Sequence, residues 1–264
     1  MTTIAIPDSC LVDERTQIDK SRKISQFARA CAIFGVDTIY VYKDGGSNSD
    51  LDLLVVILRY METPPFLRKR LFPKISELKY AGILAPLNIS SHSSPPNPKK
   101  ISSGDIRSGL VVSQKGKKYI DIGTPEPFPY RGRTESGKRI AIKFKMGYPE
   151  LNYVEVEESD YFGYKTRERN SLANIIKSWT GQIILTSRLG RAITTSDIHS
   201  YANSKDEILL AFGSTERGVG EILGSHAKRM QNTKTLNFFP KQNTKTVRLE
   251  EAVFGCLSIL HSGA

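Results

Sequence analysis

The chain has 264 residues, enough to bury a sizeable core, so it needs neither disulfides nor metals in order to fold. Lys and Arg total 38 against 27 Asp and Glu, and the net charge of +11 favours a polyanionic partner, with a solvated basic surface as the alternative. The three cysteines, Cys10, Cys31 and Cys256, are far apart, which argues against a disulfide framework and indicates a reducing cytoplasm.

The first part of the chain alternates strand and helix patterns. A short apolar run over residues 3–6 predicts a buried strand, and a second strand is expected over residues 38–42. Apolar residues recur at helical spacing over residues 24–34 and again over residues 51–58, where the helix must end before Pro64. This order predicts a parallel sheet with helical crossovers.

Residues 89–160 follow a different pattern. A linker rich in Ser and Pro precedes short alternating runs, which predict small antiparallel strands over residues 109–112, 119–122, 139–144 and 153–156. We expect an inserted OB-like β-barrel that binds RNA, with an ordinary solvated sheet as the alternative. Its expected RNA-binding residues are Lys115, Lys117, Lys118, Arg131, Arg133, Lys138, Arg139, Lys143 and Lys145.

The α/β pattern resumes after residue 160. A helix is expected over residues 172–179, and strands over residues 183–186, 208–212 and 235–239. A last helix is expected over residues 249–260. The sequence therefore predicts one discontinuous α/β domain, residues 1–88 and 161–264, interrupted by a barrel at residues 89–160. No apolar run reaches the length of a membrane span.

Three unusual loops follow the C-terminal strands, at residues 186–190, 213–218 and 240–248. Each combines Gly or Pro, which allow close approach of the backbone to a ligand, with small hydroxyl side chains. Ligands collect at the carboxyl ends of parallel strands, so the joint appearance of these loops predicts a binding site. Each loop taken alone has ordinary turn chemistry as its alternative, and none matches a Walker or dinucleotide fingerprint.

These loops carry a family resemblance. The runs LLAFGSTERG over residues 209–218 and NFFPKQNTKTVRLEEA over residues 237–252 resemble the cofactor-binding knot of SPOUT methyltransferases. The runs IAIPDS at residue 4, FARACAIF at residue 27, LRKRLFP at residue 67 and LKYAGILAPL at residue 78 are similar to the archaeal and eukaryotic branch of RNA uridine-N3 methyltransferases. The resemblance spans nearly the whole chain and is weakest across the inserted barrel.

The resemblance implies an α/β trefoil knot that binds S-adenosylmethionine and lies at a homodimer interface. It also implies the residues that hold the cofactor. They are Thr186, Leu189, Gly190, Gly213, Ser214, Gly218, Asn237, Pro240, Gln242, Thr244, Thr246 and Val247. Asn243 and the run TSR over residues 186–188 depart from the commoner family pattern and affect details of the cofactor loops.

The implied reaction is transfer of a methyl group to a uridine base, at N3, in structured RNA such as rRNA, with no metal required. Glu216, Arg217 and Arg29 are the catalytic candidates, because the ring nitrogen must lose its proton. Glu216 could instead face a helix N-terminus, and Arg29 could grip a phosphate. The competing hypotheses are a non-catalytic RNA-binding or ribosome-assembly protein that retains the knot fold, and methylation of a ribose or a guanine.

Overall fold

The computed structural model describes residues 1–92, 97–157, 161–224 and 232–263. The chain forms two compact units. The first unit contains Met1–Glu62, Ser76–Pro86 and Tyr164–Ala264, and the second contains Thr63–Ile75 and Leu87–Gly163. Among the described residues, no helix is long and apolar enough to cross a membrane.

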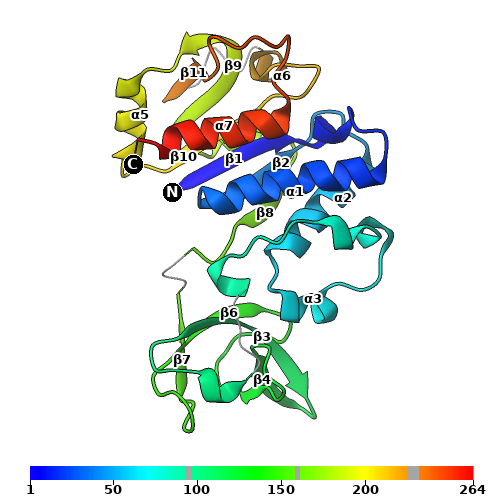
Figure 1. The fold of residues 1–264 in the computed structure, drawn as a ribbon, viewed down its shortest axis with the longest axis vertical. Helices are drawn as coiled ribbons and strands as arrows, with labels where there is room; N and C mark the ends of the chain where they lie inside the picture. The colour runs from blue at the N-terminus through cyan, green and yellow to red at the C-terminus, as the bar shows by residue number, and fades with distance from the viewer. Residues whose placement is uncertain (93–96, 158–160, 225–231, 264) are drawn as a thin grey trace. The chain divides into compact units, whose positions relative to one another are not determined.

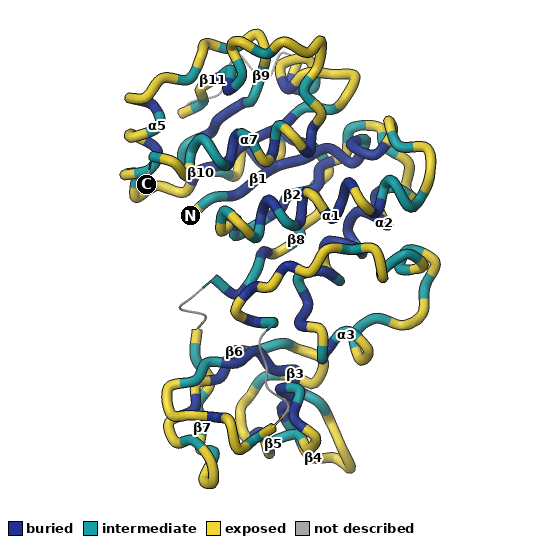
Figure 2. Tube along the Cα trace, viewed as in Figure 1, coloured by how far each residue is buried: buried dark blue, intermediate teal, exposed yellow. Residues whose placement is uncertain are grey.

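The first unit is built on a parallel sheet of six strands in the order β11-β9-β10-β1-β2-β8 (Figure 1). The strands are β1 (Thr2–Pro7), β2 (Val36–Tyr42), β8 (Lys165–Arg169), β9 (Gln182–Ala192), β10 (Ile208–Ala211) and β11 (Thr233–Asn237). The central strands β1 and β10 are buried on both faces (Figure 2). Their continuous apolar runs are typical of a parallel sheet that helices cover on both sides.

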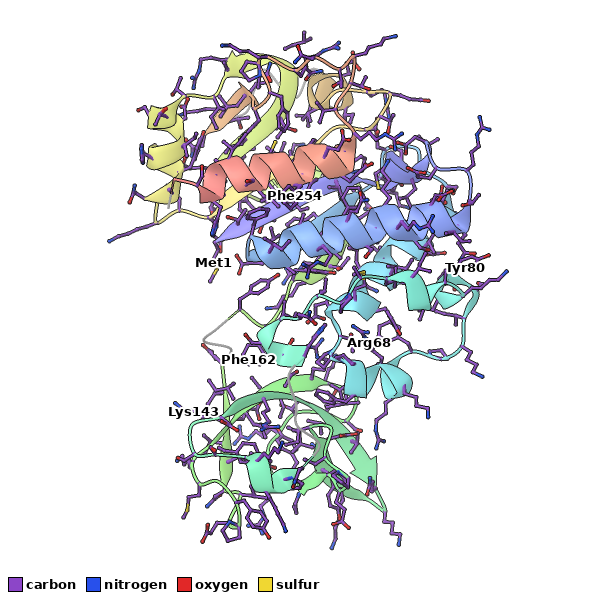
Figure 3. The ribbon with its side chains drawn as sticks, in the orientation of Figure 1. Met1, Arg68, Tyr80, Lys143, Phe162 and Phe254 are labelled. Atoms are coloured by element: carbon purple, nitrogen blue, oxygen red, sulfur yellow. The ribbon has the colours of Figure 1, made fainter. Side chains whose placement is uncertain are left out.

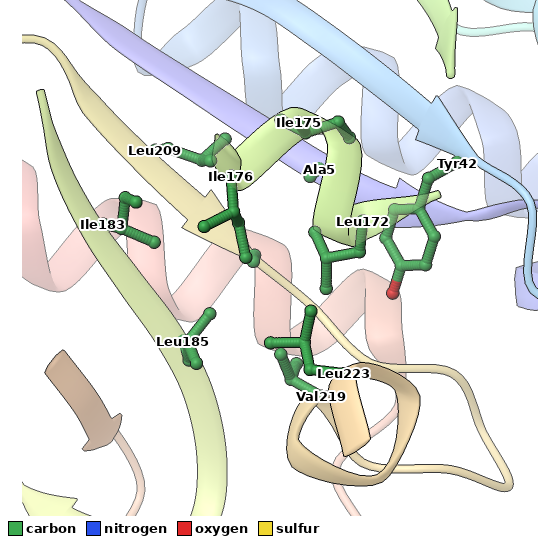
Figure 4. Packing of buried hydrophobic residues seen from close by; sticks show 11 residues of the cluster. Ala5, Tyr42, Leu172, Ile175, Ile176, Ile183, Leu185, Leu209, Val219 and Leu223 are labelled. Carbon is green, nitrogen blue, oxygen red and sulfur yellow. The ribbon is translucent and has the colours of Figure 1, made fainter. Parts of the chain in front are cut away.

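Helices pack on this sheet in two groups. Long helix α1 (Gln17–Ile33) packs against α2 (Asn48–Glu62) and α7 (Leu249–His261), and α7 also contacts α5 (Thr195–Ala202). The short helices α4 (Leu172–Lys177) and α6 (Val219–Leu223) pack together over an apolar cluster that includes Ile183 and Leu209 (Figure 4). Short 3₁₀ turns complete the unit at η1 (Asp8–Leu11), η2 (Ser76–Leu78) and η3 (Ala81–Ile83).

Local sequence signals explain where α1 begins and ends. The Thr16 side chain accepts a hydrogen bond from the Asp19 backbone N–H at 3.1 Å, which caps the first turn. Gly35 follows the helix with φ of +62°, a left-handed conformation that most residues avoid. The chain can therefore turn directly from α1 into β2.

The second unit is a curled antiparallel sheet in the order β5-β4-β3-β6-β7. Its strands are β3 (Ile106–Gln114), β4 (Lys117–Asp121), β5 (Phe128–Pro129), β6 (Arg139–Phe144) and β7 (Tyr153–Val156). Helix α3 (Pro65–Leu71) and the turns η4 (Ser90–His92) and η5 (Pro98–Lys100) belong to the same unit. The sheet encloses an apolar core that contains Val111, Ile120, Ile142 and Phe144.

Side chains connect the two outer strands of this sheet. The Tyr153 hydroxyl on β7 donates to the Pro129 carbonyl on β5 at 2.6 Å, and the Tyr130 hydroxyl donates to Glu155 at 2.6 Å. The rings of Phe128 and Tyr153 meet edge to face at 6.3 Å. These contacts bring β5 and β7 close together and account for the curl.

The structure corrects several expectations from the sequence. Residues 186–190, expected to be a loop, lie within the long strand β9. The missed elements include the edge strand β8, whose sequence KTRER has no apolar alternation, the short strand β5, and the helices α3, α5 and α6. The predicted linker over residues 90–98 lies partly outside the described residues, and its first residues form η4.

Candidate functional site

A pocket of about 380 Å³ lies within the first unit, beside the middle of β9 and at the carboxyl ends of β10 and β11. Its size falls in the range that small-molecule sites occupy. Residues from all three unusual loops line it, together with residues at the start of α7. The lining residues are Asp13, Thr186, Ser187, Arg188, Leu189, Phe212, Gly213, Ser214, Thr215, Glu216, Arg217, Gly218, Val219, Glu221, Leu236, Asn237, Phe238, Phe239, Gln242, Lys245, Thr246, Val247, Arg248, Leu249, Ala252 and Cys256.

The first wall of the pocket is an excursion of β9. Thr235 of β11 pairs with Leu185, but the next residue, Leu236, pairs with Arg191, so residues 186–190 leave the ladder. At Gly190 the chain returns to the sheet. A Cβ added at this position would lie 2.8 Å from the Leu236 carbonyl carbon, so the close approach requires glycine. At the rim, the Leu189 side chain is 90% exposed.

The second wall is the tight turn after β10. The Ser214 N–H donates to the Arg217 carbonyl at 2.9 Å, and the Arg217 N–H donates to the Ser214 hydroxyl at 3.0 Å. A Cβ at Gly213 would lie 2.7 Å from the Arg217 carbonyl oxygen, so this turn requires glycine. Gly218 faces open space, and its N–H is bonded to the Glu221 carboxylate at 3.1 Å.

The third wall is the segment between β11 and α7. The Asn237 side-chain amide donates to the Arg188 carbonyl at 3.0 Å, and the Arg188 guanidinium donates to the Lys245 carbonyl at 3.0 Å. Gln242 donates to the Thr244 carbonyl at 3.0 Å. These bonds tie the C-terminal segment to the excursion of β9 and give the pocket a fixed backbone lining.

Arg217 is held at the pocket by the loop after β2. Its guanidinium forms an ion pair with Asp44, whose side chain is only 3% exposed. Asp8 in turn fixes this loop, because its carboxylate accepts the N–H groups of Asp44 and Gly46 at 2.8 and 3.0 Å. Burial raises the pKa of the neighbouring Tyr42, so its hydroxyl stays protonated and donates to the Phe212 carbonyl at 2.5 Å.

A buried ionic cluster supports the opposite side of the pocket. Lys23 on α1 is 2% exposed, and its ammonium lies 2.6 Å from Asp13 and 3.3 Å from Glu250. Asp13 lines the pocket, and Glu250 belongs to the first turn of α7. The cluster therefore fixes the η1–α1 connection against the start of α7.

The lining mixes charged, polar and apolar groups. It combines backbone amides, hydroxyls and side-chain amides with apolar side chains such as Val247 and Ala252. The one cysteine in the lining, Cys256, is buried, and burial raises its pKa, so the thiol stays protonated and is a poor nucleophile. Among the described residues, no group of three or more His, Cys, Asp or Glu side chains could hold a metal ion.

The pocket gathers most of the residues expected at a cofactor site. Nine of the twelve line it: Thr186, Leu189, Gly213, Ser214, Gly218, Asn237, Gln242, Thr246 and Val247. Gly190, Pro240 and Thr244 are outside the lining.

The structure separates the three catalytic candidates. Glu216 and Arg217 line the pocket. Arg29 lies outside the lining and is not brought together with Glu216 and Arg217. Its guanidinium donates instead to the Pro86 carbonyl at 3.0 Å. Sequence reasoning missed Asp13, although its position just after the first strand was a usable signal.

The expected RNA-binding residues lie in the second unit, and most of them are exposed. Lys118 and Arg139 are the half-buried ones. Lys118 donates to the Thr134 carbonyl at 2.9 Å, and Arg139 contacts the Ser108 hydroxyl at 3.4 Å. These two side chains therefore have structural partners, whereas residues such as Lys143 on β6 extend outward (Figure 3).

Comparison with known proteins places this architecture in a family. An uncharacterized protein of Halobacterium salinarum is 29% identical over 98% of both chains. The human protein named 28S rRNA (uridine-N(3))-methyltransferase is 25% identical, over 99% of this chain and 78% of that protein. Its Drosophila melanogaster counterpart is 24% identical, over 98% of this chain and 61% of that protein.

A family model described as "Putative RNA methyltransferase" matches residues 1–260. The match spans both units, the pocket and the three loops that form it. The chain therefore belongs to this family of RNA methyltransferases.

Proposed function

We propose that the protein transfers a methyl group from S-adenosylmethionine to N3 of a uridine in structured RNA such as rRNA. The observation that carries the proposal is the pocket beside the middle of β9 and the carboxyl ends of β10 and β11, lined by the three segments that the family resemblance singles out. The names of the human and fly relatives support the choice of uridine N3 and of rRNA.

The donor set of the pocket fits S-adenosylmethionine. Adenine needs an apolar slot with amide hydrogen-bonding groups at its edge, and the segment around Gln242, Thr246 and Val247 offers both. Ribose hydroxyls and the amino-acid end need small polar partners, which Thr186, Ser214 and Asn237 provide. Gly218, where a Cβ would meet nothing within 4 Å, leaves room for a ligand against the backbone.

The reaction requires the uridine N3–H bond to break as the new N–CH₃ bond forms. When bound, S-adenosylmethionine would supply an electrophilic methyl group, and its thioether would leave with the electron pair of the broken methyl–sulfur bond. Glu216 is our candidate for accepting the N3 proton, since its carboxylate lines the pocket. Arg217, held by Asp44, would stabilise the negative charge that develops on the uracil carbonyl oxygens.

We further propose that the first unit is a trefoil-knotted SPOUT domain and acts as a homodimer. The bonds between the C-terminal segment and the β9 excursion support the knot. An exposed apolar face supports the dimer. Phe254 on α7, labelled in Figure 3, and Ile33 on α1 are each 48% exposed, and the ring centres of Phe254 and Phe34 lie 5.3 Å apart. A partner covering this face would remove apolar surface from water.

The second unit is, in our proposal, an OB-like barrel that grips the RNA. Its contacts between β5 and β7 and its exposed basic residues support this role. The three cysteines are buried and form no disulfide with one another, which supports a location in the reducing cytoplasm.

Calorimetric titration with S-adenosylmethionine tests the pocket. We compare the wild type with Gly213→Ala, whose Cβ would lie 2.7 Å from the Arg217 carbonyl oxygen, and with Gly220→Ala, whose Cβ meets nothing within 4 Å. The proposal expects binding by the wild type and by Gly220→Ala, and loss of binding in Gly213→Ala. A folded wild type that does not bind the cofactor would contradict the enzyme and favour the RNA-binding scaffold.

A further inference from the structure

One of the two edge strands of the parallel sheet, β8, presents a row of basic side chains. It is the edge strand beside β2 (Figure 1), and its residues alternate between the two faces of the sheet. Lys165, Arg167 and Arg169 therefore share one face, and we call them the β8 row. Neighbouring members are about 6.6 Å apart along the strand, since a parallel strand rises about 3.3 Å per residue.

The β8 row is held in place but its charge is not neutralised. The Arg169 guanidinium lies 4.8 Å from the centre of the Tyr40 ring, on the adjacent strand, and donates to the Glu168 carbonyl at 3.0 Å. Lys165 and Arg167 are exposed, and in the described part of the chain neither has a carboxylate within ion-pair distance. Glu168 points to the opposite face, where it pairs with Arg59 at 3.2 Å.

The row also leads toward the pocket. The Arg169 carbonyl accepts the Lys43 N–H at 3.1 Å, so the end of β8 adjoins the loop after β2. In this loop, Lys43 is exposed and Asp44 is already paired with Arg217, which lines the pocket. At the carboxyl edge of the sheet, Arg169 and the exposed Lys43 thus lie next to the loop that holds Arg217 at the pocket.

We propose that the β8 row binds the phosphate backbone of a single-stranded RNA segment and guides the target base into the pocket. The inference rests on the proposed RNA methylation. RNA is the expected occupant because its charges repeat along the strand, at a spacing similar to that of alternate residues on β8. Lysine and arginine contacts to phosphates position a nucleic acid without reading its sequence, which suits a guide beside a catalytic pocket.

The test uses the full chain and a fluorescein-labelled single-stranded oligouridylate. We compare the wild type with the double variant Lys165→Gln/Arg167→Gln. Single-stranded RNA contributes a salt slope of about 0.7 per phosphate contact, so the variant should lower the slope by about 1.4 and weaken binding roughly 10- to 30-fold at about 0.1 M salt. The control, Arg22→Gln/Lys205→Gln, removes the same charge from two other exposed positions of the first unit and should behave almost as the wild type.

Cofactor titration of the same proteins separates this inference from the proposed function. Unchanged S-adenosylmethionine binding with weaker RNA binding in the β8 variant alone would support the β8 row. Equal RNA affinities in the β8 variant and the wild type would overturn the role of the β8 row and leave the cofactor pocket untouched. Equal losses of RNA affinity in the β8 variant and the control variant would also overturn it. Failure of the wild type to bind S-adenosylmethionine would contradict the proposed function instead.

Discussion

Replacing Lys23 with Met should destabilise the first unit strongly. The Lys23 side chain is 2% exposed, and its ammonium lies 2.6 Å from Asp13 and 3.3 Å from Glu250. Met has a similar length but no charge, so the substitution leaves two carboxylates facing each other near the protein interior. Removing one partner of a buried ionic cluster costs about 3–5 kcal/mol, and the partial exposure of Asp13 favours the lower end of that range.

Thermal unfolding followed by circular dichroism measures this effect. In a chain of this size, about 3 kcal/mol corresponds to a fall in melting temperature of roughly 6–12 °C. Arg22→Met provides the control, because Arg22 pairs with Asp19 at the surface of the same helix, where the side chains are 61% and 42% exposed, and its loss should cost no more than about 1 kcal/mol. Adding Glu250→Gln to Lys23→Met should recover part of the loss. Equal shifts in melting temperature for Lys23→Met and Arg22→Met, or no recovery in the double variant, would refute the reasoning.

Three further predictions follow from the first unit. Asp44→Asn should loosen Arg217 and lower the methylation rate about tenfold while the affinity for S-adenosylmethionine changes little; a matching loss of affinity would contradict a positioning role. Hydrogen bonds from Arg191 hold the pKa of Asp197 well below its usual range, so stability is full above about pH 4 and falls as the carboxylate becomes protonated at lower pH. In Asp197→Asn, the melting temperature should fall less as the pH is lowered below about 4. An unchanged dependence of the melting temperature on pH would contradict this role of Asp197. Phe254→Asp should convert a dimer into monomers in analytical ultracentrifugation, whereas a persistent dimer would place the interface elsewhere.

Sequence patterns predicted the helices and strands that bury a continuous apolar run or one apolar face. The strand at residues 3–6 and the helices with apolar faces were recovered because their periodicity records contact with the core. The edge strand β8 could not be recovered in this way, because its alternate side chains are basic and face solvent. Its strand identity comes from pairing with β2, a long-range contact that leaves no local signal.

The sequence also predicted only part of the candidate site. The glycine of the Gly213 turn marks the second wall, because only that residue fits against the Arg217 carbonyl. The roles of Asp44 and Lys23 depend on partners far away in sequence, which composition and spacing do not reveal. Arg29 was expected near the reaction, but its side chain is used to hold the Pro86 carbonyl.

The central claim is methyl transfer to uridine N3. The most direct measurement incubates an unmodified rRNA transcript with the protein and S-adenosylmethionine that carries a deuterated methyl group, followed by mass spectrometry of the nucleosides. Our account predicts the label in 3-methyluridine, and its loss with Gly213→Ala. Label in a ribose or a guanine, or an unlabelled RNA despite a bound cofactor, would contradict it.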